Sequence, residues 1–443
     1  ANYTLSGGTH RLTVNQRPLN ATLARQYDAT TTAAGSTLSS FNALQGGENL
    51  TMTGSGTAAS KNVANGIAMS SNGNLALADG SGGTAGLASN YSLNSTVINI
   101  SKRVLNSSGS KTYDANTNAI ASAITLSNLA SSETLTHSGT ASISSANAGN
   151  YTITNLSGVS IADGTNGGLA ANYTLTGGTH NFTVNRRVLS VSGTRLYDAT
   201  TNAIASDLST HANLVGSETL TLSGTGTITS KNVGSNKTVS VGTLALADGS
   251  NGGLAANYTL SGGTHRLTVN QRPLVASFTR IYDGSTTLDS DDTSNVSISF
   301  NALQGGENLT MDGTGAVASK DVSVGNQSVT SVDLALANGT GGSAGQASNY
   351  SLTSSNLTIN RKSISTVYLS RQYNASNAVN GSDLSSMTGL VGSETLTLSG
   401  STTMSSANVG TNSVNAALFT LADGSNGGLA SNYTATGGTH RFT

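Results

Sequence analysis

Short segments of the chain alternate hydrophobic and polar residues with the period of two that a half-buried β-strand requires. Leu220 and Leu222 alternate with threonines, and Val239 and Val241 alternate with serines. The alternation changes phase at Gly242, where a β-bulge or tight turn would return the apolar residues to one face. The three- and four-residue spacing of an amphipathic helix is nowhere sustained over ten residues. The pattern therefore predicts an all-β protein.

Glycine-rich turn clusters separate these predicted strands. The segment LADGSNGGLA at 246–255 contains Asp248-Gly249 and Gly252-Gly253, which can supply the positive φ angles of tight turns. Because such connections are short and polar, we expect neighbouring strands to be antiparallel.

The strand and turn pattern repeats with a period near 85 residues. A Tyr-Asp or Tyr-Asn pair recurs at intervals of 84 to 91 residues, and an Asn-Tyr-Thr/Ser triplet recurs at 82 to 92. Residues 1–19 reappear unchanged at 256–274, and residues 41–52 reappear at 300–311. The pair marker comprises Tyr27, Asp28, Tyr113, Asp114, Tyr197, Asp198, Tyr282, Asp283 and Tyr373, the last followed by Asn374.

Each repeat is taken to start at the arginine that follows a Val/Ile-Asn or Ser-Lys segment. The repeats are then 17–102, 103–186, 187–271, 272–360 and 361–443, numbered 1 to 5. Residues 1–16 are predicted to be the C-terminal strand of a preceding repeat, and the chain is expected to be an excerpt of a longer array.

A repeat of about 85 residues with six to eight short strands has the size of one small antiparallel β-sandwich of the immunoglobulin-like kind. Five sandwiches joined end to end would form an elongated rod of roughly 180 Å, at ~3.3 Å per strand residue. The alternative is a right-handed β-helix with coils of about 20 residues, for which no such sub-period is visible.

Charge and composition exclude several classes of function. Only 9% of the residues are charged, the net charge is -1 and cysteine is absent. No basic face is available for nucleic acid, and no apolar run approaches the ~18 to 20 residues of a membrane helix. We therefore expect no nucleic-acid binding and no membrane insertion. The absence of cysteine fits a cytosolic protein as well as bacterial exoproteins that avoid disulfides, so it does not place the compartment. Low charge and abundant Ser, Thr and Asn favour an extracellular location.

The Tyr-Asp marker is interpreted as structural: the ring would be buried across the sandwich, and the aspartate would accept N–H bonds in the following turn. Each repeat also has a glutamate before a Leu-Thr strand, and four repeats have a later aspartate. A glycosidase needs one cleft, so replication of these carboxylates indicates turn chemistry. They are Glu48, Glu133, Glu218, Glu307 and Glu394, with Asp79, Asp163, Asp248 and Asp423.

Other candidate chemistry is sparse. The histidines of the four Gly-Gly-Thr-His copies show no metal-ligand spacing and are expected to be exposed; they are His10, His180, His265 and His440. Asp289, Asp291 and Asp292 form a weak calcium candidate that lacks the Gly and terminal Glu of an EF-hand loop. No nucleophile lies near a base in sequence, so we expect no catalytic residues, no cofactor and no enzymatic activity.

Three motifs recur in a fixed order: Arg-Val-Leu then Tyr-Asp-Ala at 187–199, Lys-Asn-Val-Gly at 231–234, and Leu-Ala-Asp-Gly through Ala-Asn-Tyr-Thr-Leu at 246–260. In this order and spacing, essentially the whole chain resembles the YDG or MBG-type repeats of large bacterial exoproteins of the filamentous haemagglutinin and adhesin class. Repeat 2 departs from the pattern at Ala146–Ala148, and repeat 5 departs at Asn374. The resemblance implies secretion across the outer membrane of a Gram-negative bacterium, commonly by a two-partner route, display as a stalk, and no catalytic residues.

The leading hypothesis is a non-catalytic stalk or spacer segment of a secreted bacterial cell-surface adhesin, whose partners are neighbouring repeats of the same longer chain. The alternative is a subunit of an extracellular filament or biofilm-matrix fibre, in which the first segment of one copy adds a strand to another copy. The strand-exchange candidates are Tyr3, Leu5, Leu12 and Val14. A glycan or receptor binder is a third reading, which an aromatic content of 4% disfavours.

Overall fold

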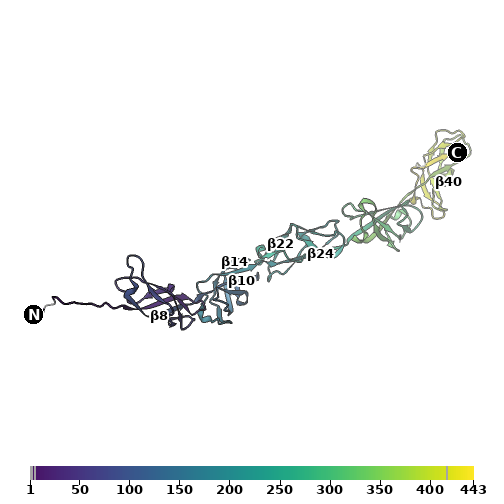
Figure 1. The fold of residues 1–443 in the computed structure, drawn as a ribbon. Coiled ribbons are helices and arrows are strands. Elements are labelled where there is room, and N and C mark those ends of the chain that lie inside the picture. The colour runs from purple at the N-terminus through teal and green to yellow at the C-terminus, as the bar shows by residue number, and fades with distance from the viewer. Residues whose placement is uncertain (1–2, 4–5, 416–417) are drawn as a thin grey trace. The chain divides into compact units, whose positions relative to one another are not determined.

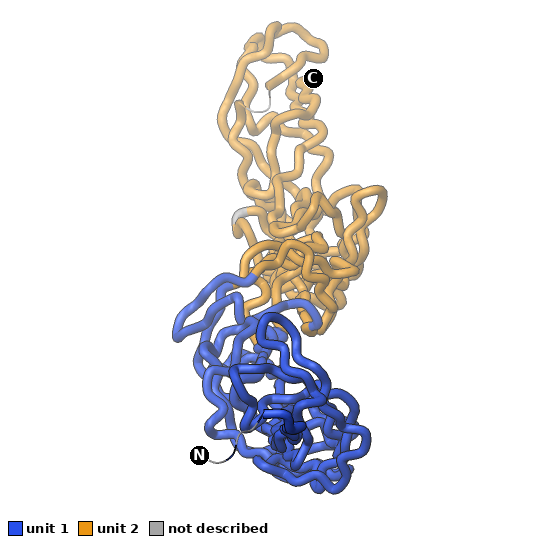
Figure 2. The backbone as a smooth tube through the Cα atoms, turned by 60° about the vertical axis from the view of Figure 1, so that its left-hand side comes forward, with its two compact units in different colours: residues 1–189, 213–221, 246–262 blue, residues 190–212, 222–245, 263–443 orange. Residues whose placement is uncertain are grey.

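In the computed structural model, which describes residue 3, residues 6–415 and residues 418–443, every regular element is a β-strand or a short 3-10 helix. The all-β prediction is therefore confirmed. No helix in these ranges is long and apolar enough to cross a membrane. The chain divides into two compact units, blue and orange in Figure 2. Unit 1 comprises residues 1–189, 213–221 and 246–262, and unit 2 comprises residues 190–212, 222–245 and 263–443.

Repeat 1 lies in unit 1 and is drawn in purple in Figure 1. Its first strand pairs in parallel with its last strand, and antiparallel pairs extend the sheet in the order β2-β5-β6-β8-β1-β3. A separate two-stranded sheet joins β4 to β7. The strands are β1 (Arg17–Gln26), β2 (Thr32–Ala34), β3 (Leu38–Phe41), β4 (Thr51–Thr53), β5 (Ser55–Ala58), β6 (Ala64–Ser71), β7 (Ala76–Ala78) and β8 (Tyr91–Ser101).

Repeat 2 also lies in unit 1 and has the sheet order β11-β13-β14-β17-β10-β12, with β15 beside β13 and a short β16-β9 pair. Its strands are β9 (Arg103–Val104), β10 (Asn106–Thr112), β11 (Asn118–Ile120), β12 (Ile124–Ser127), β13 (Leu135–Ile143), β14 (Gly149–Asn155), β15 (Val159–Asp163), β16 (Tyr173–Thr174) and β17 (His180–Asn185).

Repeat 3 contributes the parallel pair β18-β26 to unit 1 and the sheet β20-β23-β24-β27-β19-β21 to unit 2. Its strands are β18 (Arg187–Val188), β19 (Ser190–Leu196), β20 (Asn202–Ile204), β21 (Thr210–Ala212), β22 (Leu220–Ser223), β23 (Thr225–Ile228), β24 (Gly234–Ser240), β25 (Ala245–Asp248), β26 (Tyr258–Thr259) and β27 (Arg266–Asn270).

Repeats 4 and 5 lie in unit 2, where β30-β28-β36-β33 and β40-β38-β46-β43 are the larger sheets. The strands of repeat 4 are β28 (Arg272–Ile281), β29 (Thr287–Asp289), β30 (Val296–Phe300), β31 (Leu309–Asp312), β32 (Thr314–Ala316), β33 (Asn326–Ser328), β34 (Thr330–Ser331), β35 (Ala335–Asn338) and β36 (Tyr350–Asn360). Those of repeat 5 are β37 (Lys362–Ser363), β38 (Thr366–Leu369), β39 (Ala378–Asn380), β40 (Leu384–Thr388), β41 (Leu396–Ser399), β42 (Ser401–Thr403), β43 (Asn412–Ser413), β44 (Thr420–Asp423), β45 (Tyr433–Thr434) and β46 (Thr439–Phe442).

Single 3-10 turns connect many strands. In every repeat, one of them ends directly before the tyrosine of the Asn-Tyr-Thr/Ser triplet. They are η1 (Gly35–Thr37), η2 (Ala88–Asn90), η3 (Ala121–Ala123), η4 (Ala170–Asn172), η5 (Ala205–Asp207), η6 (Ala255–Asn257), η7 (Val322–Val324), η8 (Gly341–Ser343), η9 (Ala347–Asn349), η10 (Gly381–Asp383) and η12 (Ala430–Asn432).

The parallel pairing of the first and last strands differs from the antiparallel prediction. Arg17 pairs with Tyr91 and Arg272 pairs with Tyr350, so the partners are separated by most of a repeat. Turn chemistry governs strands that are adjacent in sequence, whereas these partners meet only after the intervening strands have returned the chain. A β-helix with coils of about 20 residues would pair strands in parallel one coil apart. The described strand pairs do not show that arrangement, so the β-helix alternative is wrong.

The apolar core of each unit continues across a boundary between repeats. In unit 1, one cluster joins Leu23 and Tyr27 of repeat 1 to Leu105, Ala130 and Tyr173 of repeat 2. In unit 2, one cluster contains buried residues of both repeat 4 and repeat 5. Repeats 1 and 2, and likewise repeats 4 and 5, therefore complete each other's cores.

The segment before Arg17 has no strand in its described residues. Tyr3, Leu12 and Val14 are 96%, 89% and 85% exposed, and Leu5 lies outside the described residues. The same sequence includes strand β27 where it recurs in repeat 3. Its assignment to a preceding repeat and its role in strand exchange stay predictions.

Candidate functional site at the repeat junctions

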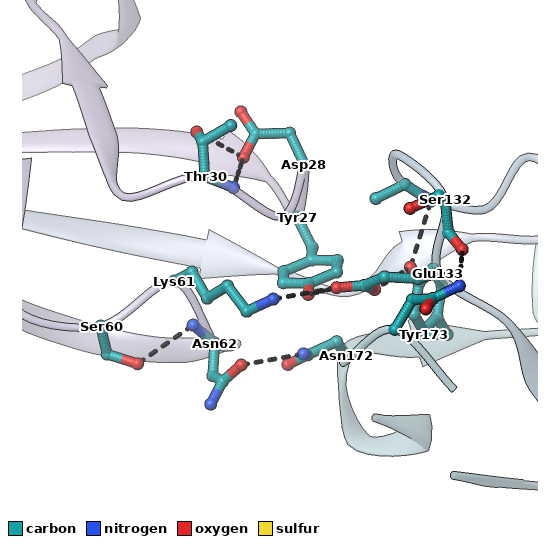
Figure 3. A network of polar contacts seen from close by, with 12 residues as sticks. Tyr27, Asp28, Thr30, Ser60, Lys61, Asn62, Ser132, Glu133, Asn172 and Tyr173 are labelled. Atoms are coloured by element: carbon teal, nitrogen blue, oxygen red, sulfur yellow. Dashed lines mark hydrogen bonds and ion pairs between the residues drawn. The ribbon is translucent and has the colours of Figure 1, made fainter. Parts of the chain in front are cut away.

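Buried polar side chains gather where the Tyr-Asp marker of one repeat meets the glutamate of the next. Figure 3 shows the first of these boundaries, within unit 1. Tyr27 of repeat 1 donates its hydroxyl to Glu133 Oε1 at 2.6 Å, and Tyr173 of repeat 2 donates to Oε2 at 2.6 Å. The two rings pack edge to face, with centroids 5.4 Å apart and an interplanar angle of 79°. One carboxylate thus binds a tyrosine from each repeat.

Short-range contacts place each partner. Tyr27 directly follows β1, and its backbone N–H donates to the carbonyl of Ser101 at the end of β8. Glu133 closes a turn by donating its backbone N–H to the carbonyl of Ala130. The N–H of Ala130 donates to the Tyr173 hydroxyl at 3.1 Å. Glu133 and Tyr173 are therefore both positioned by contacts within repeat 2.

Lys61 of repeat 1 supplies a positive charge to the same carboxylate. Its Nζ lies 3.0 Å from Glu133 Oε1, and the glutamate side chain is only 3% exposed. A buried carboxylate without partners costs several kcal/mol, so these three donors make the burial of Glu133 possible. Burial alone would raise the pKa of Glu133, but hydrogen bonds from Tyr173, Tyr27 and Lys61 outweigh it and hold that pKa below its usual value.

The tyrosines shift in the opposite direction. Burial and the hydrogen bond to Glu133 raise the pKa of Tyr173 to about 12, and the same two causes raise the pKa of Tyr27. Efficient general acids and bases have pKa values near the working pH. At neutral pH this carboxylate is ionised and these phenols are protonated, so the arrangement is suited to holding two repeats together.

A second polar layer lies beside the carboxylate. Asn172 is 1% exposed; its Oδ1 accepts the backbone N–H of Val63 at 2.9 Å, and its Nδ2 donates to Asn62 Oδ1 at 3.0 Å. Arg103 also donates to the backbone carbonyl of Tyr27 at 3.4 Å. The boundary is therefore bonded by side chains of both repeats as well as by shared apolar packing.

We call this arrangement a Tyr–Glu–Tyr junction, and it occurs four times. Each unit contains two copies, in which the rings lie 5.3 to 5.4 Å apart at 75° to 79°. A buried asparagine of the second repeat accepts a backbone N–H of the first repeat in every copy. The triads are Tyr27–Glu133–Tyr173, Tyr113–Glu218–Tyr258, Tyr197–Glu307–Tyr350 and Tyr282–Glu394–Tyr433.

The lysine is the variable component. Lys231 and Lys320 contact Glu307 and Glu394 at 2.6 and 3.2 Å, as Lys61 contacts Glu133. In repeat 2 the corresponding position is Ala146, and Glu218 is held by Tyr113 at 2.7 Å and Tyr258 at 2.5 Å. The two tyrosines and the glutamate are therefore the constant core of the junction.

The outcome for the Tyr-Asp markers is mixed. The aspartates accept the N–H two residues later, as predicted; Asp28 accepts from Thr30 at 2.9 Å, and Asn374 accepts from Ser376 at 3.1 Å. The first four tyrosines are buried as predicted, but their hydroxyls reach the next repeat. Tyr373 is 64% exposed, so its predicted burial is wrong. The other four marker rings each pack on a tyrosine of the following repeat.

The repeated carboxylates separate into two roles. Asp163 Oδ1 accepts the N–H of Ala170 at 2.7 Å, which confirms turn chemistry, and Asn338 does the same for Ala347 at 2.8 Å. The same turn prediction is incomplete for Glu133 and its counterparts, which also accept a tyrosine hydroxyl from the preceding repeat. Their side chains serve the junction because the turn leaves the carboxylate directed at the neighbouring repeat.

The predicted exposure of the Gly-Gly-Thr-His histidines is wrong for three of the four. His180, His265 and His440 are buried at 7%, 4% and 8% exposure, whereas His10 is exposed as expected. His180 is satisfied by Ser107 Oγ at 2.9 Å and the Leu175 carbonyl at 2.7 Å, so burial costs it no hydrogen bond.

The calcium candidate receives no support. Asp289 and Asp292 accept the backbone N–H groups of Asp291 and Ser294 in their own turns. Within the described ranges, no group of three or more His, Cys, Asp or Glu side chains could hold a metal ion.

The lysines and asparagines of the junction are not among the residues that the sequence pattern singled out. Lys61-Asn62-Val63 and Asn172-Tyr173 belong to motifs that recur with the same period as the Tyr-Asp marker. That common period was a usable signal of contact. It does not say whether the motifs meet within a repeat or between repeats.

Comparison with family models finds one domain repeated along the chain. The YDG domain matches five times, at residues 11–98, 101–180, 184–265, 264–359 and 356–440. The chain belongs to the YDG domain family. No curated protein sequence matches it. Repeat 4 contains the sequence Tyr-Asp-Gly, and the third residue of the triplet has positive φ in every YDG repeat: Ala29 66°, Ala115 61°, Ala199 63°, Gly284 77° and Ala375 57°.

Proposed function

We propose that this YDG array is a non-catalytic structural spacer, a stalk segment of a secreted bacterial cell-surface adhesin. One observation carries the proposal: the same Tyr–Glu–Tyr junction joins consecutive repeats at four boundaries. Repeat proteins derive much of their stability from contacts between nearest neighbours. Copies that bind their neighbours through one recurring contact add length without adding a new site.

The finer parts of the proposal rest on the sequence. We infer that each repeat acts as one small immunoglobulin-like sandwich and that the array is extracellular. Support comes from the low charge and the resemblance to exoprotein repeats. In repeat 1, the six-stranded sheet and the two-stranded β4-β7 sheet are the two layers such a sandwich would use.

Small-angle X-ray scattering with light scattering on the purified chain tests the spacer. An end-to-end array would be a monomer with a maximum dimension of roughly 180 Å, at ~3.3 Å per strand residue. A compact globule would contradict the proposal.

A junction variant sharpens this experiment. The double variant Glu133→Ala, Glu307→Ala removes one carboxylate from a junction in each unit, and we expect a broader distribution of maximum dimensions because the repeats lose their fixed contact. Glu48→Ala is the matched control, since Glu48 accepts the hydroxyl of Tyr91 in its own repeat at 2.5 Å, whereas Glu133 and Glu307 also accept a tyrosine hydroxyl from the preceding repeat. Equal scattering profiles for all three proteins would contradict a role of the junction in fixing the repeats.

The second candidate is a filament or biofilm-matrix subunit assembled by strand exchange. The exposure of Tyr3, Leu12 and Val14 favours it, because residues 1–19 duplicate a segment that contains a strand in repeat 3. Fibre growth that depends on concentration and disappears on deletion of residues 1–16 would support it. Growth that survives the deletion would exclude strand exchange.

A further inference from the structure

In the junction between repeats 2 and 3, an alanine replaces the lysine that the other three junctions share. In those three, the lysine Nζ lies 2.6 to 3.2 Å from the glutamate Oε1. The corresponding residue of repeat 2 is Ala146. Among the described residues, Glu218 pairs with no basic side chain, and its Oε1 accepts the hydroxyl of Tyr113 at 2.7 Å. Glu218 is 9% exposed, so its negative charge is largely buried beside an alanine, where the other junctions place an ammonium group.

The loop that carries Ala146 is held in the same way as the loops that carry the lysines. The N–H of Ala148 donates to Asn257 Oδ1 at 2.8 Å, and the equivalent groups of the other junctions are 2.9 Å apart. Asn257 Nδ2 donates to Asn147 Oδ1 at 3.0 Å, the same distance as in the junction of repeats 1 and 2. Alanine at position 146 therefore leaves the loop in place and removes only the propylammonium part of the side chain.

The lysine junctions show what the position of this ammonium group can bind. Nζ contacts a carboxylate oxygen that also accepts a tyrosine hydroxyl. In two junctions it lies 5.9 Å from the centroid of that tyrosine ring, within the range of a cation–π contact. The lysine side chains are 34% to 42% exposed, so solvent reaches the position. Glu218 and Tyr113 supply the same carboxylate and ring between repeats 2 and 3.

These groups suit a primary ammonium better than a metal ion. Calcium and magnesium take about six or more oxygen ligands. Within the described ranges, no group of three or more His, Cys, Asp or Glu side chains could hold such an ion. A primary ammonium instead donates directed hydrogen bonds and is attracted by the face of an aromatic ring. One carboxylate oxygen and one tyrosine ring match that chemistry, and the remaining N–H groups can face water.

We propose that the junction of repeats 2 and 3 is a binding site for a short primary aliphatic amine. The ammonium group donates to Glu218 Oε1 and lies against the ring of Tyr113, and the alkyl chain lies beside Ala146, along the path that the lysine side chain takes in the other junctions. The bound amine strengthens the contact between the two repeats, because it supplies the charge-assisted hydrogen bond that a lysine supplies elsewhere. This site depends on the junction alone and not on where the protein is located.

Hydrogen exchange in the presence of propylammonium chloride tests this site. The amide of Ala148 reports the opening of the junction, because it donates to Asn257 across the boundary. Its exchange should slow saturably, by about tenfold when the amine is at about ten times its dissociation constant. The equivalent amides of Val63, Val233 and Val322 should not change, since a lysine already serves their junctions. No slowing at Ala148, or equal slowing at all of these amides, would overturn the proposal.

Two other salts separate the primary ammonium from charge and ionic strength. Sodium chloride matches the ionic strength, and tetramethylammonium chloride provides an organic cation that has no N–H to donate. Neither should slow exchange at Ala148. An effect of either salt as large as that of propylammonium would overturn the assignment of a primary amine.

Reciprocal variants place the site at the junction. Ala146→Lys should slow exchange at Ala148 by about tenfold without added amine and should abolish the response to propylammonium. Lys61→Ala makes the opposite change between repeats 1 and 2, so it should create a response at Val63 even if Ala146→Lys disturbs its own loop. A response at Ala148 that survives Ala146→Lys, or no response at Val63 in Lys61→Ala, would overturn the proposal. Either failure would leave the spacer proposal intact, because scattering tests that proposal separately.

Discussion

Glu133 is only 5% exposed, and it is ionised because Tyr27, Tyr173 and Lys61 supply three hydrogen-bond donors. Two of those donors come from the preceding repeat, so the charge is satisfied only when the repeats are in contact. Hydrogen bonds to charged groups contribute ~1.5–3 kcal/mol each, more than typical neutral ones. At the residue scale, the junction depends on one carboxylate whose desolvation is offset by its neighbours.

Removing one hydroxyl tests this dependence. Tyr27→Phe keeps the ring and deletes the donor to Glu133, so we expect the junction to lose about 1.5–3 kcal/mol. Hydrogen exchange of the amides of Val63 and Tyr173 would report the faster local opening. Tyr373→Phe is the matched control, because its ring is exposed and the change should stay within ~0.5 kcal/mol. Equal losses in both variants would contradict the prediction.

The junction should also weaken in acid. Contacts in the fold lower the pKa of Glu133, Glu307 and Glu394, so their contribution to stability is present above the unfolded pKa of ~4.3 and is lost as pH falls through the lower folded pKa. Thermal unfolding followed by circular dichroism should show midpoints that fall below about pH 4.5. The triple variant with glutamine at these positions should start lower and change less. A parallel decline in both proteins would argue against the junction as the cause.

At the element scale, the first strand differs between repeats four positions before the tyrosine marker. Leu23, Phe278 and Leu369 are buried there, whereas repeats 2 and 3 have Gly109 and Gly193. A Cβ on Gly193 would lie 1.7 Å from the carbonyl oxygen of Asp207, in the last position of η5. The glycine lets that turn approach β19 closely. The first strand and the 3-10 turn that approaches it are therefore matched to each other within a repeat, although the junction between repeats keeps the same residues.

Gly193→Ala should therefore disturb the strand and turn together. Because the clash is with backbone, we expect a loss of about 1–3 kcal/mol. Gly342→Ala is the control, since no atom lies within 4 Å of its added Cβ. Hydrogen exchange of the β19 amides, measured in the presence of urea, would compare the two variants. Equal protection in both variants would mean that the turn can shift at no cost.

At the scale of the whole molecule, YDG repeats are coupled to their neighbours through shared cores and junctions. Tyr282 of repeat 4 is fully buried against Glu394 and Tyr433 of repeat 5. In a linear array, stability is approximately a sum over repeats and nearest-neighbour contacts. The loss of one repeat should therefore destabilise mainly the adjacent repeat.

Truncation after residue 360 tests this coupling. Removing repeat 5 uncovers Tyr282 and takes away the apolar residues that complete the core of repeat 4, so β28 and β36 should exchange amide hydrogens faster. Repeat 1 should keep its protection. Removing residues 1–16 is the control and should leave every repeat unchanged, because the described residues of this segment are largely exposed. Uniform loss of protection after truncation would contradict nearest-neighbour coupling.

The sequence by itself determined the strands, the 85-residue period, the Asp turns and the family, because alternation and turn chemistry act between residues close along the chain. Only the tertiary structure decided that Tyr27 reaches Glu133, 106 residues away, that the first and last strands pair in parallel, and that His180 is buried. These contacts join segments whose local patterns are compatible with several partners. Long-range packing and the need to satisfy buried charge select among those partners, and a one-dimensional pattern contains neither.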